Sequence, residues 1–171
     1  MLQEDQWYAL FVQTGEEDNV KERLMYRLGE QYAVVVPKRK LKERKNGKWT
    51  YNTRIMLPGY VLLNGYIDGN TYYRLKGIPG LYKLLRSGND ITAIHDTEMK
   101  VLSRLICNSE VIGFSEILMV DGEVKVVDGP LVEMEGRIVS INHRKGRAKV
   151  CFDFLGETRL VELGVEMLKL A

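Results

Sequence analysis

The sequence predicts an α+β protein in which helices cover an antiparallel sheet, followed by a small five-stranded β-barrel. Three observations lead to this fold class. The segment QWYALFVQT (6–14) alternates between two faces, as a strand does. Val20, Leu24 and Leu28 recur every four residues, which is helical spacing. From residue 122 onward, apolar and polar residues alternate between glycine-bearing turns, a pattern typical of a small barrel.

Each element follows from a local signal. The first helix is expected after Thr14, because Thr14 and Glu17 have capping-box spacing, and Gly29 is expected to end it. Asn46-Gly47 is a strong hairpin turn signal, so residues 39–45 and 48–54 are predicted to form a projecting two-stranded arm. The other expected elements are strands at 32–37, 55–63 and 80–86 and helices at 70–76 and 96–106.

The change of pattern along the chain predicts two domains. Residues 1–108 form the first and residues 122–171 the second, and periodicity fades in the predicted linker, 109–121. The N-terminus lacks a signal peptide and no stretch is long and apolar enough for a membrane span, so we expect a cytoplasmic protein. Cys107 and Cys151 are far apart and are expected to be core residues or idle thiols.

Charge is concentrated locally, although the net charge is only +2. Residues 38–54 hold eight Lys or Arg against one acid, Glu43. Arg144, Lys145, Arg147 and Lys149 cluster within six positions. Such clusters, rather than overall charge, indicate a surface for nucleic acid.

The sequence contains no motif that indicates an enzyme. Phosphate-loop, nucleophile-elbow and zinc-protease signatures do not occur. His143 has no second ligand at metal-binding spacing. We therefore expect a protein that is not an enzyme, binds no cofactor or metal, and is a monomer.

Several motifs resemble those of the NusG family of transcription elongation factors. The segment VKVVDGPLVEMEGRIVSI (124–141) is similar to a KOW motif of a Tudor/SH3-like barrel. The segments WYALFVQTGEEDNVKERL, IMLPGYVLL and IPGLYKLLRSG resemble, in order, those of a NusG-type N-terminal domain. The resemblance covers nearly the whole chain. It implies a first domain that binds RNA polymerase and a second that recruits a partner.

The stretch from Asn142 to Arg147 departs from the mixed or acidic sequence typical of housekeeping members. It is similar to LoaP, a specialised paralogue associated with antitermination, whose KOW domain is implicated in binding an RNA hairpin. The chain is therefore expected to be a processive antitermination factor. The expected RNA-binding residues are Asn142, His143, Arg144, Lys145, Gly146, Arg147 and Lys149.

Physical chemistry supports this choice of residues. Gly146 permits a tight turn, strand alternation places Arg147 and Lys149 on one face, and arginine binds phosphate or guanine bidentately. Because an A-form helix hides its bases in a deep, narrow groove, specific recognition requires a hairpin distorted by a bulge or extruded nucleotide. The alternative interpretation is a basic turn that only aids solubility.

The family resemblance also implies a surface that contacts the clamp helices of the polymerase β' subunit. Its residues are Phe11, Ile55, Leu57, Pro58 and Tyr60, with Thr71 and Tyr72 placed where some paralogues contact the opposite side of the cleft. The alternative is that these residues are core. The arm at 38–54 is a candidate contact for upstream DNA, with Trp49 or Tyr51 stacking on a base, or else a solvated hairpin.

Two other functions remain open at this stage. A general NusG would recruit ribosomal protein S10 or Rho through a KOW domain that uses Leu131 and Met134. A ribosome-associated KOW protein would leave the apolar polymerase surface unexplained.

Overall fold

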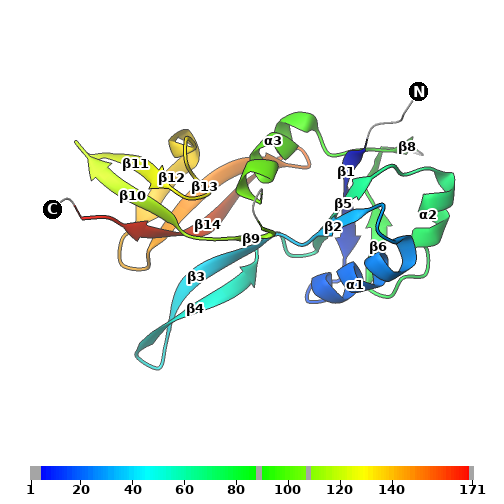
Figure 1. The fold of residues 1–171 in the computed structure, drawn as a ribbon, viewed down its shortest axis with the longest axis horizontal. Helices are drawn as coiled ribbons and strands as arrows, with labels where there is room; N and C mark the ends of the chain where they lie inside the picture. The colour runs from blue at the N-terminus through cyan, green and yellow to red at the C-terminus, as the bar shows by residue number, and fades with distance from the viewer. Residues whose placement is uncertain (1–4, 88–89, 107–108, 170–171) are drawn as a thin grey trace. The chain divides into compact units, whose positions relative to one another are not determined.

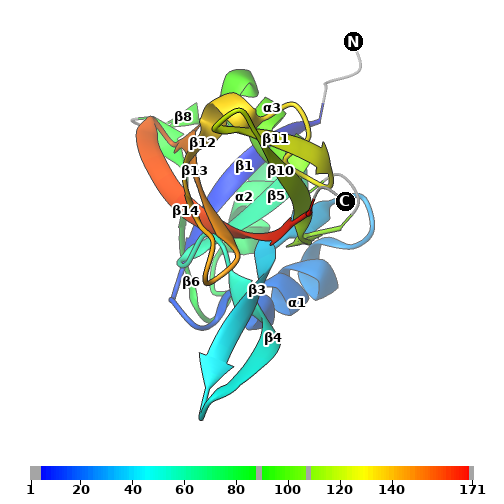
Figure 2. The same cartoon turned by 90° about the vertical axis from the view of Figure 1, so that its left-hand side faces the viewer.

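The computed structural model describes residues 5–87, 90–106 and 109–169, and Figures 1 and 2 show it in two orientations. It divides into two compact units. Unit 1 comprises Met1–Pro37 and Leu57–Met99, and unit 2 comprises Lys38–Met56 and Lys100–Ala171. The arm at 38–54 thus groups with the C-terminal strands, whereas the sequence places it in the first domain. The domain boundaries themselves stay a prediction.

Unit 1 is built on a four-stranded antiparallel sheet. Its strands are β1 (Gln6–Val12), β2 (Ala33–Val35), β5 (Tyr60–Gly65) and β6 (Leu81–Leu84), in the order β2-β5-β1-β6. Tyr8, Ala9 and Leu10 are buried in succession, so both faces of β1 are covered. The short strands β7 (Arg86–Ser87) and β8 (Asp90–Ile91) pair with each other.

The helices follow the predicted positions, but one predicted cap is wrong. Helix α1 spans Glu17–Leu28 and buries Val20, Leu24 and Leu28, as the spacing predicts. The residue at its N-cap is Glu16, which makes no side-chain capping bond. Glu17 instead folds back, and its carboxylate accepts a hydrogen bond from the Gly15 amide at 2.6 Å.

Two further α-helices are present in the described residues. Helix α2 (Gly69–Leu75) begins after Asp68, whose carboxylate accepts a hydrogen bond from the Thr71 amide at 2.9 Å. Helix α3 spans Asp96–Leu105, close to the predicted 96–106.

The predicted arm in unit 2 is confirmed as an antiparallel hairpin of β3 (Lys38–Lys45) and β4 (Lys48–Ile55). Asn46 and Gly47 both have positive φ, at 53° and 76°, as a two-residue hairpin turn requires. Strand β9 (Val111–Ile112) pairs in parallel with β3 and extends the hairpin into a three-stranded sheet.

The second sheet of unit 2 has five strands in the order β11-β10-β14-β13-β12. They are β10 (Ser115–Val120), β11 (Glu123–Asp128), β12 (Ile138–Asn142), β13 (Arg147–Phe154) and β14 (Glu157–Met167). Alternate residues of β13, including Val150, Phe152 and Phe154, are fully buried and form the core beneath the sheet.

The five strands predicted for the barrel are present, but their sheet does not close into a full barrel. Strands β11 and β12 are its two edges and do not pair with each other in the described chain. A 3-10 turn, Glu135–Arg137, separates them. Here the Glu135 carboxylate accepts a hydrogen bond from the Val126 amide at 3.0 Å, so a side chain satisfies the strand's backbone donor. The segment 109–121, predicted as a linker, contains β9 and β10.

Candidate functional site

The loop between β12 and β13 has a fixed turn. The Asn142 side-chain oxygen accepts a hydrogen bond from the Lys145 amide at 3.0 Å. Gly146 has φ +64°, and its carbonyl accepts a hydrogen bond from the Val165 amide at 2.9 Å. Asn142 and Gly146 therefore shape the loop, and the Asn142 oxygen is engaged within it.

The basic side chains in and directly after this turn are exposed, apart from Arg147. His143, Arg144 and Lys145 lie at its tip and are exposed to solvent. On β13, Ala148 is buried while Lys149 is exposed, which confirms the alternation inferred from the sequence. Arg144, Lys145 and Lys149 thus remain available to a phosphate-bearing ligand.

Arg147 lies on the same face but is engaged by the protein itself. Its side chain is 17% exposed, and Nη1 donates to Oε2 of Glu162 at 2.8 Å. Nη2 donates to the backbone carbonyl of Lys42 in the hairpin at 3.3 Å. Arg147 therefore joins two segments of unit 2. Both of its Nη atoms already have partners within the protein, which argues against the predicted direct contact with RNA.

The Glu162 carboxylate is the acidic centre of this cluster. The hydrogen bond from Arg147 is the main cause that lowers its pKa below 4.5, and the charges of Arg147, Arg39 and Lys145 act in the same direction. Burial lowers the pKa of the Arg39 guanidinium, and the negative charge of Glu162 opposes that shift. One carboxylate thus interacts with cations from both the hairpin and the loop.

A metal centre is not evident in the part of the chain that the structure describes, where no three His, Cys, Asp or Glu side chains come together. Cys151 is a half-buried free thiol. Cys107 lies outside the described residues.

The predicted polymerase-contact residues fall into two groups in the structure. Phe11 and Tyr60 are paired across β1 and β5, with ring centroids 5.2 Å apart, and both are half-buried. Pro58 is exposed in the turn that precedes Tyr60. Leu57 is 1% exposed and Thr71 is 4% exposed, so these two side chains are buried in this structure, as the alternative interpretation expects.

Thr71 is held in place by polar contacts. Its hydroxyl lies 2.8 Å from the Tyr32 hydroxyl and 3.0 Å from the Asp68 carboxylate. Ile55 is half-buried at the end of β4 and belongs to unit 2. The structure therefore does not bring all seven predicted residues into one described surface.

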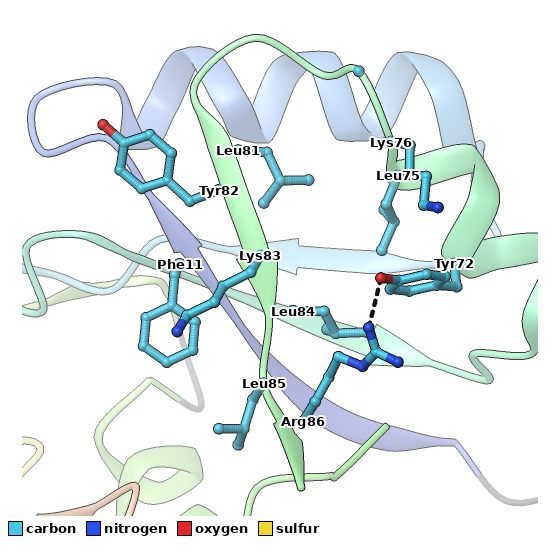
Figure 3. Close-up of a pocket in the computed structure, with 11 residues that line it drawn as sticks. Phe11, Tyr72, Leu75, Lys76, Leu81, Tyr82, Lys83, Leu84, Leu85 and Arg86 are labelled. Carbon is cyan, nitrogen blue, oxygen red and sulfur yellow. Dashed lines mark hydrogen bonds between the residues drawn. The ribbon is translucent and has the colours of Figure 1, made fainter. Parts of the chain in front are cut away.

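Figure 3 shows a pocket of unit 1 that connects Phe11 with Tyr72 across strand β6. Arg86 Nη1 donates to the Tyr72 hydroxyl at 2.7 Å, and the guanidinium lies 4.9 Å from the centre of that ring. Lys83 Nζ lies 5.0 Å from the centre of the Phe11 ring. Each cation thus lies over an aromatic face, a favourable electrostatic arrangement.

Sequence reasoning missed these pocket cations and also missed Glu162. Lys83 and Arg86 each lie next to apolar residues in the segment 80–86, and no sequence motif marks either cation. Glu162 gains its role only through pairing of β14 with β13, where it lies opposite Lys149. A correct strand register was the missing signal.

Comparison with known proteins places the chain in a family. The family model described as "Transcription termination factor nusG" matches residues 5–103, more than half of the chain. The chain belongs to the NusG family.

Curated NusG-family relatives align over almost the full length. The transcription termination/antitermination protein NusG of Bacillus subtilis is 29% identical, with 94% of this chain and 95% of the relative covered. The protein of the same name from Pseudomonas aeruginosa is 28% identical, with 92% and 93% covered. That of Rickettsia felis is 25% identical, with 96% and 89% covered.

A solved structure supports the fold. The structure titled "Domain interaction in Thermotoga maritima NusG" superposes with a TM-score of 0.60 at 23% identity and covers 94% of each chain. This chain therefore has a NusG-like fold of helices and mostly sheet. None of its described helices is both long and apolar enough to cross a membrane.

Proposed function

We propose that this NusG-family protein is a processive antitermination factor of the LoaP type. Its N-terminal domain, residues 1–108, binds the clamp helices of RNA polymerase, and its KOW domain, residues 122–171, binds a hairpin in the nascent transcript. The observation that carries the proposal is the loop between β12 and β13. Its turn is fixed by Asn142 and Gly146 and exposes Arg144 and Lys145 together.

Electrostatics favours RNA over a protein partner for this loop. Arg144, Lys145 and Lys149 are exposed, and the Glu162 carboxylate on the neighbouring strand β14 is already bonded to Arg147. Phosphates of a folded transcript would neutralise the remaining cations and release counterions, which drives binding. His143, exposed at the tip, adds a group that can donate or accept a hydrogen bond to a base edge.

The alternative KOW function, recruitment of ribosomal protein S10 or Rho, is less well supported by the residues proposed for it. Leu131 is 1% exposed and Met134 is 4% exposed, so both belong to the core of unit 2. They offer little apolar surface to a protein partner in this conformation.

The RNA arm of the test uses the full chain and a hairpin enriched from a randomised RNA pool. The loop variant carries Arg144→Gln, Lys145→Gln and Lys149→Gln. The control carries Lys100→Gln, Lys125→Gln and Lys169→Gln, three exposed cations elsewhere, so it removes the same charge.

We expect the loop variant to bind about 100-fold more weakly at physiological salt, with a log–log salt slope smaller by about 2–3, while the control binds like the wild type. If no hairpin is preferred over unstructured RNA, the antitermination proposal fails. Capture of ribosomal protein S10 or Rho would then favour the general NusG function.

The polymerase arm measures binding of the full chain to purified bacterial RNA polymerase. Phe11→Ala with Tyr60→Ala should weaken binding at least about tenfold, because paired aromatic anchors dominate such interfaces. Tyr26→Ala, which removes a 94% exposed ring on α1, is the control. Equal affinity of all three proteins would remove Phe11 and Tyr60 from the interface.

A further inference from the structure

The hairpin of β3 and β4 is joined to the five-stranded sheet of unit 2 by two reciprocal arginine bonds. Arg39 Nη1 of the hairpin donates to the backbone carbonyl of Glu162 on β14 at 2.7 Å. In the opposite direction, Arg147 Nη2 of the sheet donates to the carbonyl of Lys42 at 3.3 Å. Because both acceptors are backbone atoms, each bond fixes the path of a strand as well as a side chain.

Apolar contacts reinforce these bonds. Leu41, between the two bonded positions of the hairpin, is 3% exposed. The Tyr51 ring of β4 meets the Phe114 ring edge-on, with centroids 5.5 Å apart and an interplanar angle of 89°. The absence of a side chain at Gly164 lets β14 approach the hairpin, since a Cβ there would lie 2.6 Å from the Lys40 carbonyl oxygen.

This packing brings the hairpin next to the basic loop. Arg147 begins β13 directly after the loop, and its guanidinium reaches Lys42, so the loop and the middle of β3 are neighbours. Figure 2 shows the β12–β13 loop beside β3. Two cationic segments that are about a hundred residues apart in sequence are therefore adjacent in space.

The outer half of the hairpin carries cations around one aromatic ring. Lys42 Nζ lies 4.9 Å and the Arg44 guanidinium 5.9 Å from the centre of the Trp49 indole. Arg44, Lys45 and Lys48 are exposed, and Trp49 is 37% exposed. The only acid of the hairpin, Glu43, is paired with Arg54 at 2.9 Å and leaves these cations without neutralisation from that carboxylate.

We propose that the hairpin tip and the β12–β13 loop form one composite surface that binds a single folded RNA, with Trp49 stacking on an unpaired base of that RNA. This inference rests on the proposed RNA-binding function and extends it to a segment outside the KOW domain. The loop cations contact phosphates of the stem, and Arg44, Lys45 and Lys48 contact phosphates of the adjoining strand. Arg39 and Arg147 are positioning residues that hold the two halves together.

The chemistry favours a transcript with an unpaired nucleotide next to a stem. A row of cations binds phosphates of any sequence, but a tryptophan flanked by cations is suited to a base that has left the helical stack. Bases inside a regular A-form stem are not accessible to an indole ring. The composite surface therefore predicts a bulged or frayed hairpin as its ligand, and a lower affinity for a DNA hairpin of the same sequence.

The experiment uses the full chain and the hairpin RNA enriched from a randomised pool. The hairpin-tip variant carries Arg44→Gln, Lys45→Gln and Lys48→Gln, none of which forms a described salt bridge. We expect about 10- to 100-fold weaker binding and a salt slope smaller by about 2–3, because about three phosphate contacts are lost. The control carries Lys100→Gln, Lys125→Gln and Lys169→Gln and should bind like the wild type.

Photocrosslinking tests the stacking contact directly. A 5-iodouridine placed at the unpaired position of the enriched hairpin should crosslink to Trp49, and Trp49→Leu should abolish that crosslink while the fold is retained. A crosslink that maps elsewhere, together with wild-type affinity of the hairpin-tip variant, would overturn the composite surface.

The two proposals fail in different ways. If the loop variant Arg144→Gln, Lys145→Gln, Lys149→Gln loses binding while the hairpin-tip variant matches its control, the composite surface is refuted and the RNA-binding function stands. If neither variant differs from the control, both proposals are refuted. Equal binding of RNA and DNA hairpins would also contradict the composite surface, because it assigns the unpaired base and A-form stem to RNA.

Discussion

The pocket of unit 1 and the basic surface of unit 2 both place cations on aromatic rings, but they are assembled in different ways. In unit 1, Arg86 and Tyr72 are 14 residues apart and lie on β7 and α2. In unit 2, the bonds from Arg147 to Lys42 and from Arg39 to Glu162 join positions 105 and 123 residues apart. The first site depends on local chain geometry, and the second depends on how two distant segments dock.

The two surfaces are therefore sensitive to different kinds of substitution. A change that leaves every strand intact can still separate the hairpin from the five-stranded sheet. The corresponding change in unit 1 removes a single interaction, because β1, β6 and α2 stay in place through their own pairing and packing. Three substitutions or conditions test this contrast, in order of decreasing effect.

Gly164→Ala should have the largest effect. The new Cβ would meet the Phe114 ring and the Lys40 carbonyl, so β14 and the hairpin must move apart. We expect the free energy of unfolding to fall by about 1–3 kcal/mol. Amides of residues 38–55 should also lose protection in hydrogen exchange.

Gly136→Ala is the matched control, because a Cβ there meets open space. Its free energy of unfolding should stay within about 0.5 kcal/mol of the wild type. If the hairpin amides of Gly164→Ala exchange as slowly as those of the wild type, the close approach of β14 is not what holds the hairpin in place.

Acid should have an intermediate effect on unit 2. The pKa of Glu162 is lowered in the folded state by its bond with Arg147, so its stabilising contribution is present above the unfolded pKa, near 4.5. That contribution is lost as pH falls below 4.5 and through the lower folded value.

A pH series of unfolding measurements checks this dependence. Glu162→Gln, which cannot ionise, should flatten the acid limb of the stability profile relative to the wild type. In the same pH range, the hairpin amides should lose more protection in the wild type than in Glu162→Gln, where the Glu43–Arg54 pair remains to be titrated. A profile of Glu162→Gln that superimposes on that of the wild type would contradict the assigned role of the carboxylate.

Tyr72→Phe should have the smallest effect. It removes the hydroxyl that accepts a hydrogen bond from Arg86 but keeps the ring beneath the guanidinium. The site is exposed, so we expect a loss of about 0.5 kcal/mol or less in the free energy of unfolding. Tyr26→Phe on α1 is the control, and RNA affinity should be unchanged in both. A loss as large as that of Gly164→Ala would remove the contrast between the two regions.

Several features were predictable because they depend on neighbours in the chain. Alternation located β1 and β13, four-residue spacing located α1, and Asn46-Gly47 located the hairpin turn within a residue. The prediction of a Thr14 cap failed because the helix begins only at Glu17, whose carboxylate accepts hydrogen bonds from the Gly15 amide and from the Gly59 amide of another loop. Spacing alone does not reveal these partners.

The candidate sites divide in the same way. The cluster Arg144, Lys145 and Lys149 was visible in the sequence, and the structure leaves these side chains exposed. The role of Arg147 was not visible, because its partners Glu162 and Lys42 come from other strands. Burial of Leu57 and Thr71 was likewise undecided, since an apolar or small polar residue in a strand or helix can face either side.

Periodicities, turns and local concentrations of charge could be predicted from the sequence, because each is a relation between residues a few positions apart. The open sheet of unit 2, and the packing of the basic hairpin against that sheet, are evident only in the folded chain. Those outcomes depend on backbone groups of one segment finding donors in another, as the Lys42 and Glu162 carbonyls do with Arg147 and Arg39. Such pairings leave no periodic trace in the chain, because the partners are chosen by packing and not by spacing.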